Sequence, residues 1–223
     1  MARVLILFAH PALEKSRMHR RLVAERPALP RLTFHDLYEA YPAFDIDVAR
    51  EQALLVAHDV IVFQHPFYWY STPPLLKQWE DLVLEHGWAY GSQGTALAGK
   101  RFLSVITAGG GAAAYQWEGY NRFTVRELLA PLEQTARLCH MEFVPPYVIH
   151  GTHQMTDGDI AREAARYREL LSALHDDRVD FARASHHQTL NDAHDDAHDD
   201  AHDGAHDGAH DGAHDGPSIE VIA

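Results

Sequence analysis

The stretch QHPFYWYSTPPLLK, residues 64–77, indicates what kind of fold this chain adopts. The short apolar run before it, Val60–Phe63, has the length and β-branching of a buried strand. After it, apolar residues recur at helical spacing from Leu75 to Val83, and Thr72 is expected to cap that helix. The four consecutive aromatic residues at 67–70 therefore lie on a strand-to-helix turn, at the rim where open α/β sheets bind ligands. Two interpretations stay open: a hydrophobic plug or subunit contact, and a platform for a flat ligand.

Strands and helices alternate along the rest of the chain. Strands are predicted at residues 4–8, 32–35, 60–64, 102–107 and 143–150, and helices at 16–25, 47–57, 72–84, 122–138 and 157–175. Ser16, Asp47 and Asp157 are the expected helix caps. Pro131 is expected to kink its helix, and Pro145-Pro146 to make the start of the last strand irregular. Five strands alternating with helices imply a parallel sheet with right-handed crossovers.

The bulk composition is that of a globular domain with an acidic tail. The 223 residues are 46% hydrophobic, enough for one core, and no run approaches the ~20 apolar residues of a membrane span. The formal charge is −13, but residues 191–223 hold ten acids and no Lys or Arg, and no basic stripe points to nucleic acid. Cys139 is the single cysteine, which excludes an intrachain disulfide and fits a reducing compartment. A soluble, cytoplasmic protein is expected.

The tail is a repeat. Residues 193–216 are six tetrapeptides, Ala-His-Asp-Asp twice and Ala-His-Asp-Gly four times, which have almost nothing to bury and are expected to be disordered. Alternating His and Asp could ligate a divalent metal, but a solvated acidic tail is the favoured interpretation, because a flexible chain offers no preformed geometry. The expected organisation is a domain at residues 1–180 and a His/Asp-rich disordered tail at 181–223. No metal site is predicted.

Five motifs occur in order: FAHP at 8–11, the stretch 64–77, HGWAYG at 86–91, GTAL at 94–97 and TAGGG at 107–111. Together they resemble the NAD(P)H quinone oxidoreductase family, and within it the ancillary subunits of glutathione-regulated potassium-efflux systems. The resemblance extends from about residue 4 to 175. It implies a flavodoxin-like, doubly wound five-stranded parallel sheet with strand order 2-1-3-4-5.

The first of three candidate loops follows the first strand and leads into a helix N-terminus, where free N–H groups and the helix dipole favour a phosphate. Without a glycine-rich fingerprint, the residues alone favour an ordinary helix cap. The resemblance implies instead that this loop contacts the phosphate of a flavin. The residues it implies are His10, Ser16, Arg17, Met18 and His19. The family more often has a small residue and Asn at the last two positions.

The other two loops follow the third and fourth strands. The resemblance places Phe67, Tyr68, Trp69 and Tyr70 against the isoalloxazine ring of the flavin, and gives the N–H groups of Thr107, Ala108, Gly109 and Gly110 to its polar edge. From the residues alone, the glycines at 109–111 predict close approach of the backbone to a ligand and positive φ, or else a plain flexible turn.

Tyr115 and Asn121 are the candidate catalytic residues. Related quinone reductases have a Tyr at this distance from the glycines and a His six residues later, both near the hydride acceptor. Here the later residue is Asn121, which can donate a hydrogen bond but cannot take up a proton. Tyr115 is expected to donate to a quinone oxygen, and a purely structural Tyr remains the alternative. His35, His58, His140, His150 and His153 show no metal spacing and are interpreted as structural or exposed.

The sequence therefore predicts a flavin-dependent NAD(P)H:quinone oxidoreductase that works by two-electron ping-pong transfer. The resemblance implies FMN, with FAD as the alternative, NAD(P)H as the reductant and a homodimer. A regulatory subunit of a membrane potassium/proton antiporter is the second hypothesis, with or without reductase activity, and would place the protein at the inner face of the membrane. A flavodoxin-like electron carrier is a third hypothesis, disfavoured because flavodoxins lack a loop of the type at residues 65–77.

Overall fold

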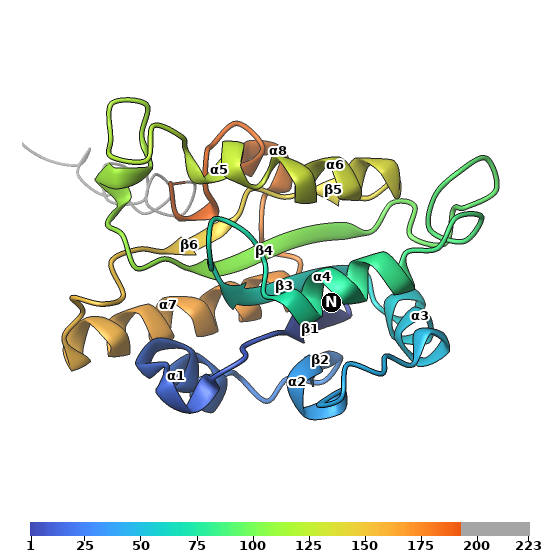
Figure 1. Ribbon diagram of the computed structural model, residues 1–223, viewed down its shortest axis with the longest axis horizontal. Helices are drawn as coiled ribbons and strands as arrows, with labels where there is room; N and C mark the ends of the chain where they lie inside the picture. The colour runs from blue at the N-terminus through green and yellow to red at the C-terminus, as the bar shows by residue number, and fades with distance from the viewer. Residues whose placement is uncertain (193–223) are drawn as a thin grey trace, which may run out of the picture.

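A computed structural model of the chain describes residues 1–192, in which a parallel sheet lies between two layers of helices (Figure 1). The strands are β1 (Val4–Phe8), β2 (Leu32–Asp36), β3 (Val60–Pro66), β4 (Arg101–Thr107), β5 (Glu142–Phe143) and β6 (Tyr147–Ile149). Their order is β2-β1-β3-β4-β5, and β6 also pairs with β4. The predicted doubly wound fold and its strand order are confirmed.

Eight α-helices and two 3₁₀ turns connect the strands within these residues. They are η1 (Leu13–Lys15), α1 (Arg17–Glu25), α2 (Leu37–Ala40), α3 (Val48–Ala57), α4 (Pro74–Val83), η2 (Ala112–Tyr115), α5 (Val125–Leu128), α6 (Ala130–Leu138), α7 (Asp157–His175) and α8 (Phe181–Ala184). None of the helices within residues 1–192 has both the length and the apolarity needed to cross a membrane.

The side chains of β1 alternate between two hydrophobic cores. Leu5 and Leu7 belong to the core that also contains residues of α3, α4 and α6. Ile6 and Phe8 belong to the core that contains residues of α1, α7 and α8, and α1 packs beside α7 (Figure 1). Because helices cover both faces, all five residues of β1 are buried, as expected for a parallel strand in a doubly wound sheet.

Two of the predicted helix caps, Thr72 and Asp157, are wrong. The N-cap of α4 is Pro73 and no side chain caps it, because Pro74 at the first helical position has no N–H that needs a partner. The N-cap of α7 is Thr156, whose hydroxyl accepts from the N–H of Asp159 while the Asp159 carboxylate accepts from the N–H of Thr156. This reciprocal capping box outcompetes Asp157. The caps Ser16 and Asp47 are confirmed.

Proline divides two predicted elements. The helix expected over 122–138 is two helices, α5 and α6, and Pro131 lies in the first turn of α6 rather than at a kink. The strand expected over 143–150 is interrupted between β5 and β6, because Pro145 and Pro146 have no N–H to donate to the ladder. Both halves still pair with β4, so the strand order is unaffected.

Residues 181–192, predicted to belong to the tail, pack on the domain instead. Leu190 is buried and its N–H donates to the carbonyl of Pro146. The side-chain amide of Asn191 bonds both the N–H and the carbonyl of Val148, which satisfies an edge of β6. The domain therefore continues past residue 180, and the His/Asp repeat at 193–216 lies outside the described residues.

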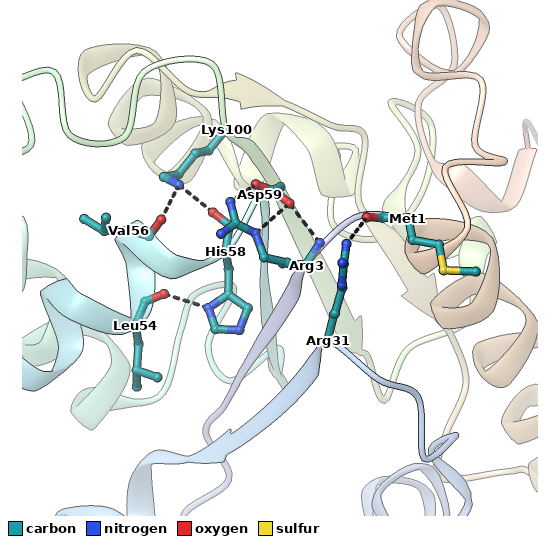
Figure 2. Close-up of polar contacts among 8 residues, drawn as sticks. All are labelled: Met1, Arg3, Arg31, Leu54, Val56, His58, Asp59 and Lys100. Atoms are coloured by element: carbon teal, nitrogen blue, oxygen red, sulfur yellow. Dashed lines mark hydrogen bonds and ion pairs between the residues drawn. The ribbon is translucent and has the colours of Figure 1, made fainter.

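A polar cluster closes the amino-terminal edge of the sheet (Figure 2). Asp59 accepts from the backbone N–H and the guanidinium of Arg3, at 2.9 and 2.6 Å, joining the starts of β1 and β3. Lys100, just before β4, donates to the carbonyls of Val56 and His58. Arg3 and Lys100 lower the pKa of Asp59 to about 2, the hydrogen bond from Arg3 being the main cause. These bonds occupy the polar groups at the amino-terminal edge of the sheet, whereas ligand sites in such sheets lie at the carboxyl ends of the strands.

Candidate functional site

A cavity of about 680 Å³ opens at the carboxyl ends of the strands. The loop after β1 contributes His10 and the run 15–18, and the loop after β3 contributes residues 66–69. Thr107 and Gly109 line it from the end of β4. All three predicted loops therefore meet at one rim, and the cavity is within the usual size range of small-molecule sites.

The cavity is lined by basic groups and by no carboxylate. Lys15 and Arg17 lie on its wall together with the imidazole rings of His10 and His153, although the chain as a whole carries a formal charge of −13. A concave surface with one sign of charge concentrates ligands of the opposite sign. The lining therefore favours an anionic ligand.

The N-terminus of α1 adds backbone donors. The Ser16 hydroxyl accepts from the N–H of His19 at 3.1 Å, and the first intrahelical bond runs from Arg20 to Ser16. Within residues 1–192, the N–H groups of Arg17 and Met18 have no hydrogen-bond partner. Free N–H groups at the positive end of a helix dipole form a phosphate site.

His10 is a buried neutral donor beside these groups. Its side chain is 5% exposed, and its Nδ1 accepts from the N–H of Ala12 at 3.1 Å, so the proton is on Nε2. Burial lowers the pKa of His10, with a smaller opposing effect from Glu14. At neutral pH the ring can thus donate a hydrogen bond without a charge.

Arg17 and His19 are positioned differently from a simple phosphate clamp. The Arg17 guanidinium is 2.7 Å from Asp157 and 3.0 Å from the carbonyl of Met155, so it ties α1 to the start of α7. The His19 side chain is fully buried outside the cavity lining, where its Nε2 lies 2.9 Å from the Thr107 hydroxyl. His19 therefore holds a lining residue in place instead of lining the cavity itself.

The aromatic run forms a strained turn. Trp69 and Tyr70 have φ of 50° and 64°, and the N–H of Ser71 donates to the carbonyl of Tyr68 at 3.0 Å. This is the pattern of a type I′ turn, in which Gly or Asn normally occupies the central positions. Phe67 points inward and is buried, whereas the Trp69 side chain is 92% exposed at the mouth of the cavity. Backbone strain of this kind gathers at ligand sites.

The glycine loop is close-packed rather than left-handed. None of the glycines at 109–111 has positive φ, so that expectation is wrong. A Cβ added to Gly109 would lie 2.5 Å from the ring of His153, and one added to Gly110 would lie 3.3 Å from the ring of Tyr115. The backbone of this loop therefore packs closely against neighbouring side chains, and its close approach to a ligand stays a prediction.

The backbone donors of this loop are not all free. The N–H of Ala108 is already bonded to the carbonyl of Ile149 at 2.8 Å, as part of the sheet. The N–H groups of Gly109 and Gly110 have no partner within residues 1–192 and remain available to a ligand.

Tyr115 and Asn121 lie near this loop. Tyr115 is 7% exposed, with its ring 6.2 Å from that of Phe67 and 5.4 Å from that of His150. Burial raises the pKa of Tyr115, so its hydroxyl stays protonated and can donate. Asn121 accepts a hydrogen bond from the Tyr70 hydroxyl at 3.2 Å, which joins the aromatic turn to the loop after β4.

Sequence reasoning missed a fourth loop. Thr152 and His153 line the cavity just after β6. His153 is exposed, as predicted, but its place on the cavity wall was not predicted. The position of these residues could have predicted their place in the site, because residues that follow the last strand of a parallel sheet lie at the same rim as the other loops. Across residues 1–192, no cluster of three or more His, Cys, Asp or Glu is arranged to hold a metal ion.

Comparison with known proteins places the chain in a family. A family model described as flavodoxin-like fold matches residues 2–171. The chain belongs to this family. The ancillary protein KefF of the glutathione-regulated potassium-efflux system of Klebsiella aerogenes is 42% identical over 168 residues, 75% of this chain and 94% of the relative.

Two solved structures carry the same fold. General stress protein 14 of Treponema denticola, in complex with FMN, is 42% identical with a TM-score of 0.73, over 77% of this chain and 99% of that one. An NADPH-quinone reductase from P. pentosaceus is 33% identical with a TM-score of 0.68, over 75% of this chain and 96% of that one. The resemblance inferred from the motifs is thus confirmed.

Proposed function

We propose that the protein is an FMN-dependent NAD(P)H:quinone oxidoreductase that works by two-electron ping-pong transfer. The observation that carries the proposal is the cavity itself, which is basic and free of carboxylates at α1, aromatic at residues 67–69, and lined by Gly109, whose N–H group is free. A flavin mononucleotide has a phosphate, a flat amphipathic ring and a polar ring edge, so each wall of the cavity has a matching part of the ligand.

The residues at α1 would hold the phosphate. The free N–H groups of Arg17 and Met18, the Ser16 hydroxyl and the Nε2–H of His10 can all donate to an anion. Lys15 adds positive charge at the cavity wall. The complex of FMN with general stress protein 14 supports FMN over FAD here.

The aromatic turn and the glycine loop would hold the ring system. Phe67 and Tyr68 offer apolar surface, and the N–H groups of Gly109 and Gly110 can donate to the polar ring edge. When bound, FMN would take two electrons from NAD(P)H and pass them to the quinone. Donors that are fixed before the reaction stabilise negative charge without reorganising.

Tyr115 would act on the acceptor. Its hydroxyl is kept protonated by burial and lies beside the glycine loop, within 3.7 Å of a Cβ built on Gly110. It can donate a hydrogen bond to a quinone oxygen as negative charge develops there. Asn121 would position the Tyr70 side chain and so shape the mouth of the cavity.

A homodimer forms part of the proposal. Six aromatic side chains at the same rim are exposed in the single chain: Tyr68, Trp69, Tyr70, Trp117, Tyr120 and Phe123. Aromatic groups of this kind gather at interfaces between subunits. Light scattering should give twice the chain mass of 25.1 kDa at micromolar concentration, and a single-chain mass would contradict the dimer.

The test of the main proposal is spectroscopic and kinetic. The purified protein, incubated with FMN, should show the visible flavin bands and should oxidise NAD(P)H only when a quinone is added. Ping-pong transfer predicts parallel double-reciprocal plots for the two substrates. A protein that stays colourless with both FMN and FAD would rule out the proposal.

A regulatory role at a potassium/proton antiporter is the second candidate. The 42% identity to KefF over 94% of its length favours it. The two functions separate in one experiment, in which potassium efflux is measured in cells that co-express the antiporter. Activation that is undiminished in Tyr115→Phe, although quinone reduction is slowed, would support a regulatory subunit that needs no catalysis.

A further inference from the structure

A second cavity lies between α4 and the helix pair α5–α6. Its volume is about 300 Å³, and it shares no lining residue with the candidate flavin site. Its walls are mostly apolar, with Leu84 from the end of α4 and Leu129, Leu132 and Leu138 from α5–α6. A cavity of this size holds roughly ten non-hydrogen atoms, at about 30 Å³ each.

One carboxyl group in this cavity has no partner. Glu80 lines it and is 8% exposed, yet within residues 1–192 its carboxylate makes no hydrogen bond and no ion pair. The other buried glutamate provides a contrast. The Glu51 carboxylate accepts from Tyr41 and Trp79 at 2.5 and 2.8 Å and contacts His35 at 2.8 Å. Buried carboxyl groups are normally satisfied in this way, whereas the Glu80 oxygens face the open cavity and are available to a ligand.

The charges nearest to Glu80 oppose each other, since Lys77 lowers the pKa of its carboxyl and Asp81 raises it. On α4, Lys77 and Asp81 also line the cavity, but they form an ion pair with each other. The lining residues that face it from α5–α6 are leucines, Pro131, Thr135 and Cys139, with no charged group among them. Burial raises the pKa of the Cys139 thiol to about 11, so it stays neutral. When Glu80 is ionised, the lining therefore carries one net negative charge.

We propose that this cavity, which we call the Glu80 crevice, binds a small organic monocation: an ammonium group with an apolar body of about six to eight carbons. The ammonium would pair with the Glu80 carboxylate and the apolar body would lie along the leucine walls. Tyr90 adds an aromatic ring to the lining, and such rings accompany carboxylates in ammonium sites. The proposal does not depend on a flavin or on reductase activity.

The Glu80 crevice and the candidate flavin site are lined by different residues of the same loop. Ser71 and Thr72 line the crevice, and Ser71 closes the strained turn that holds Trp69. A ligand in the Glu80 crevice would therefore contact the loop whose preceding residues line the flavin cavity.

The experiment measures binding of n-hexylammonium by titration calorimetry, to the full chain without flavin. Hexan-1-ol tests the need for the charge. Glu80→Gln keeps the shape and removes the charge, and it is not expected to unfold the protein because it eliminates a buried, unpaired carboxylate. The double variant Lys77→Met/Asp81→Asn is the matched control, since it removes the neighbouring ion pair and leaves the net charge of the lining unchanged.

Saturable binding of hexylammonium to the wild type, weakened about 10-fold or more by Glu80→Gln and little changed in Lys77→Met/Asp81→Asn, supports the proposal. Burial raises the pKa of Glu80 to about 7, so binding should strengthen as the pH rises from 6 to 8. Equal affinity for hexanol, equal binding by Glu80→Gln, or no saturable binding would overturn it. A loss of dimer in Glu80→Gln would assign the crevice to a subunit contact and would overturn it too.

Discussion

The hydroxyl of Tyr70 donates a hydrogen bond to Oδ1 of Asn121 across 3.2 Å, joining two loops that are 51 residues apart in the chain. The resemblance to quinone reductases implies a His at the position of Asn121. Here it accepts a hydrogen bond from the aromatic turn, so its proposed role is to hold the mouth of the site. Tyr70 is one of two residues that the turn keeps at positive φ, and the bond helps to fix that strained conformation.

The first prediction concerns this pair. Tyr70→Phe and Asn121→Ala should each raise KM for the quinone about 3- to 10-fold and change kcat less, because either change frees the same two loops. The double variant should be no worse than the single ones, since both remove one bond. Steady-state kinetics of the four proteins measure the coupling. Additive losses would show that the two side chains act separately.

The second prediction concerns Tyr115. If its hydroxyl donates to the acceptor oxygen, Tyr115→Phe should slow quinone reduction about 5- to 30-fold, which corresponds to about 1–2 kcal/mol. A donor to a developing oxyanion is worth roughly 2.7–4 kcal/mol at the strongest, and water substitutes for part of it in an open site. Flavin affinity should not change.

The measurement is single-turnover oxidation of the reduced flavoprotein by a quinone. Asn121→Ala is the comparison, and its rate should fall less than that of Tyr115→Phe. An unchanged rate in Tyr115→Phe would return Tyr115 to a structural role against Phe67 and His150. A larger defect in Asn121→Ala would reverse the two assignments.

The third prediction uses the glycine loop. Gly109→Ala must displace the His153 ring, because the added Cβ would lie 2.5 Å from it. His153 is exposed and free to turn, so the free energy of unfolding should fall by less than about 1 kcal/mol, while FMN affinity drops about 3- to 10-fold as the wall of the cavity shifts. FMN titration and urea unfolding measure the two effects.

Gly111→Ala is the control for this substitution, since a Cβ at Gly111 meets no atom within 4 Å. Its FMN affinity should match the wild type. His153→Ala shows whether the ring itself contributes to binding. Equal losses in Gly109→Ala and Gly111→Ala would mean that loop flexibility, not the contact with His153, controls affinity.

The fourth prediction is a pH dependence of stability. Burial raises the pKa of Glu80 to about 7 in the folded protein, above an unfolded value of about 4.3. The folded state therefore binds the proton more tightly, and this carboxyl lowers stability progressively as the pH rises from about 4 to about 7. Glu80→Gln removes the penalty, so the variant should exceed the wild type by on the order of 1–3 kcal/mol at pH 8 and by much less at pH 5.

Urea unfolding at the two pH values, without any amine present, measures this difference. Asp81→Asn should show no comparable gain, because Asp81 is exposed and paired with Lys77. A Glu80→Gln gain that is the same at pH 5 and pH 8 would show that the Glu80 carboxyl is not the group that titrates.

Much of the fold was readable from the sequence, for a local reason. The buried runs Val4–Phe8 and Val60–Phe63 are continuously apolar, and the Ser16 cap acts on a residue only three positions away. Because the carboxyl ends of parallel strands meet at one rim, the sequence alone also predicted that three loops lie together. The errors at Thr72 and Asp157 were also local: Pro74 removes the need for a cap on α4, and the capping box of Thr156 and Asp159 displaces Asp157 from the start of α7.

What only the tertiary structure decided depends on residues far apart in the chain. His153 reaches Gly109 because β6 pairs with β4, and Tyr70 reaches Asn121 because two loops fold toward each other. The sequence predicts that Glu80 lies on an amphipathic helix, but it does not predict whether another side chain pairs with its carboxylate. That depended on which side chains α5–α6 present to it, and they are uncharged. Local sequence determines backbone conformation over a few residues, whereas the surroundings of a side chain depend on how distant elements pack.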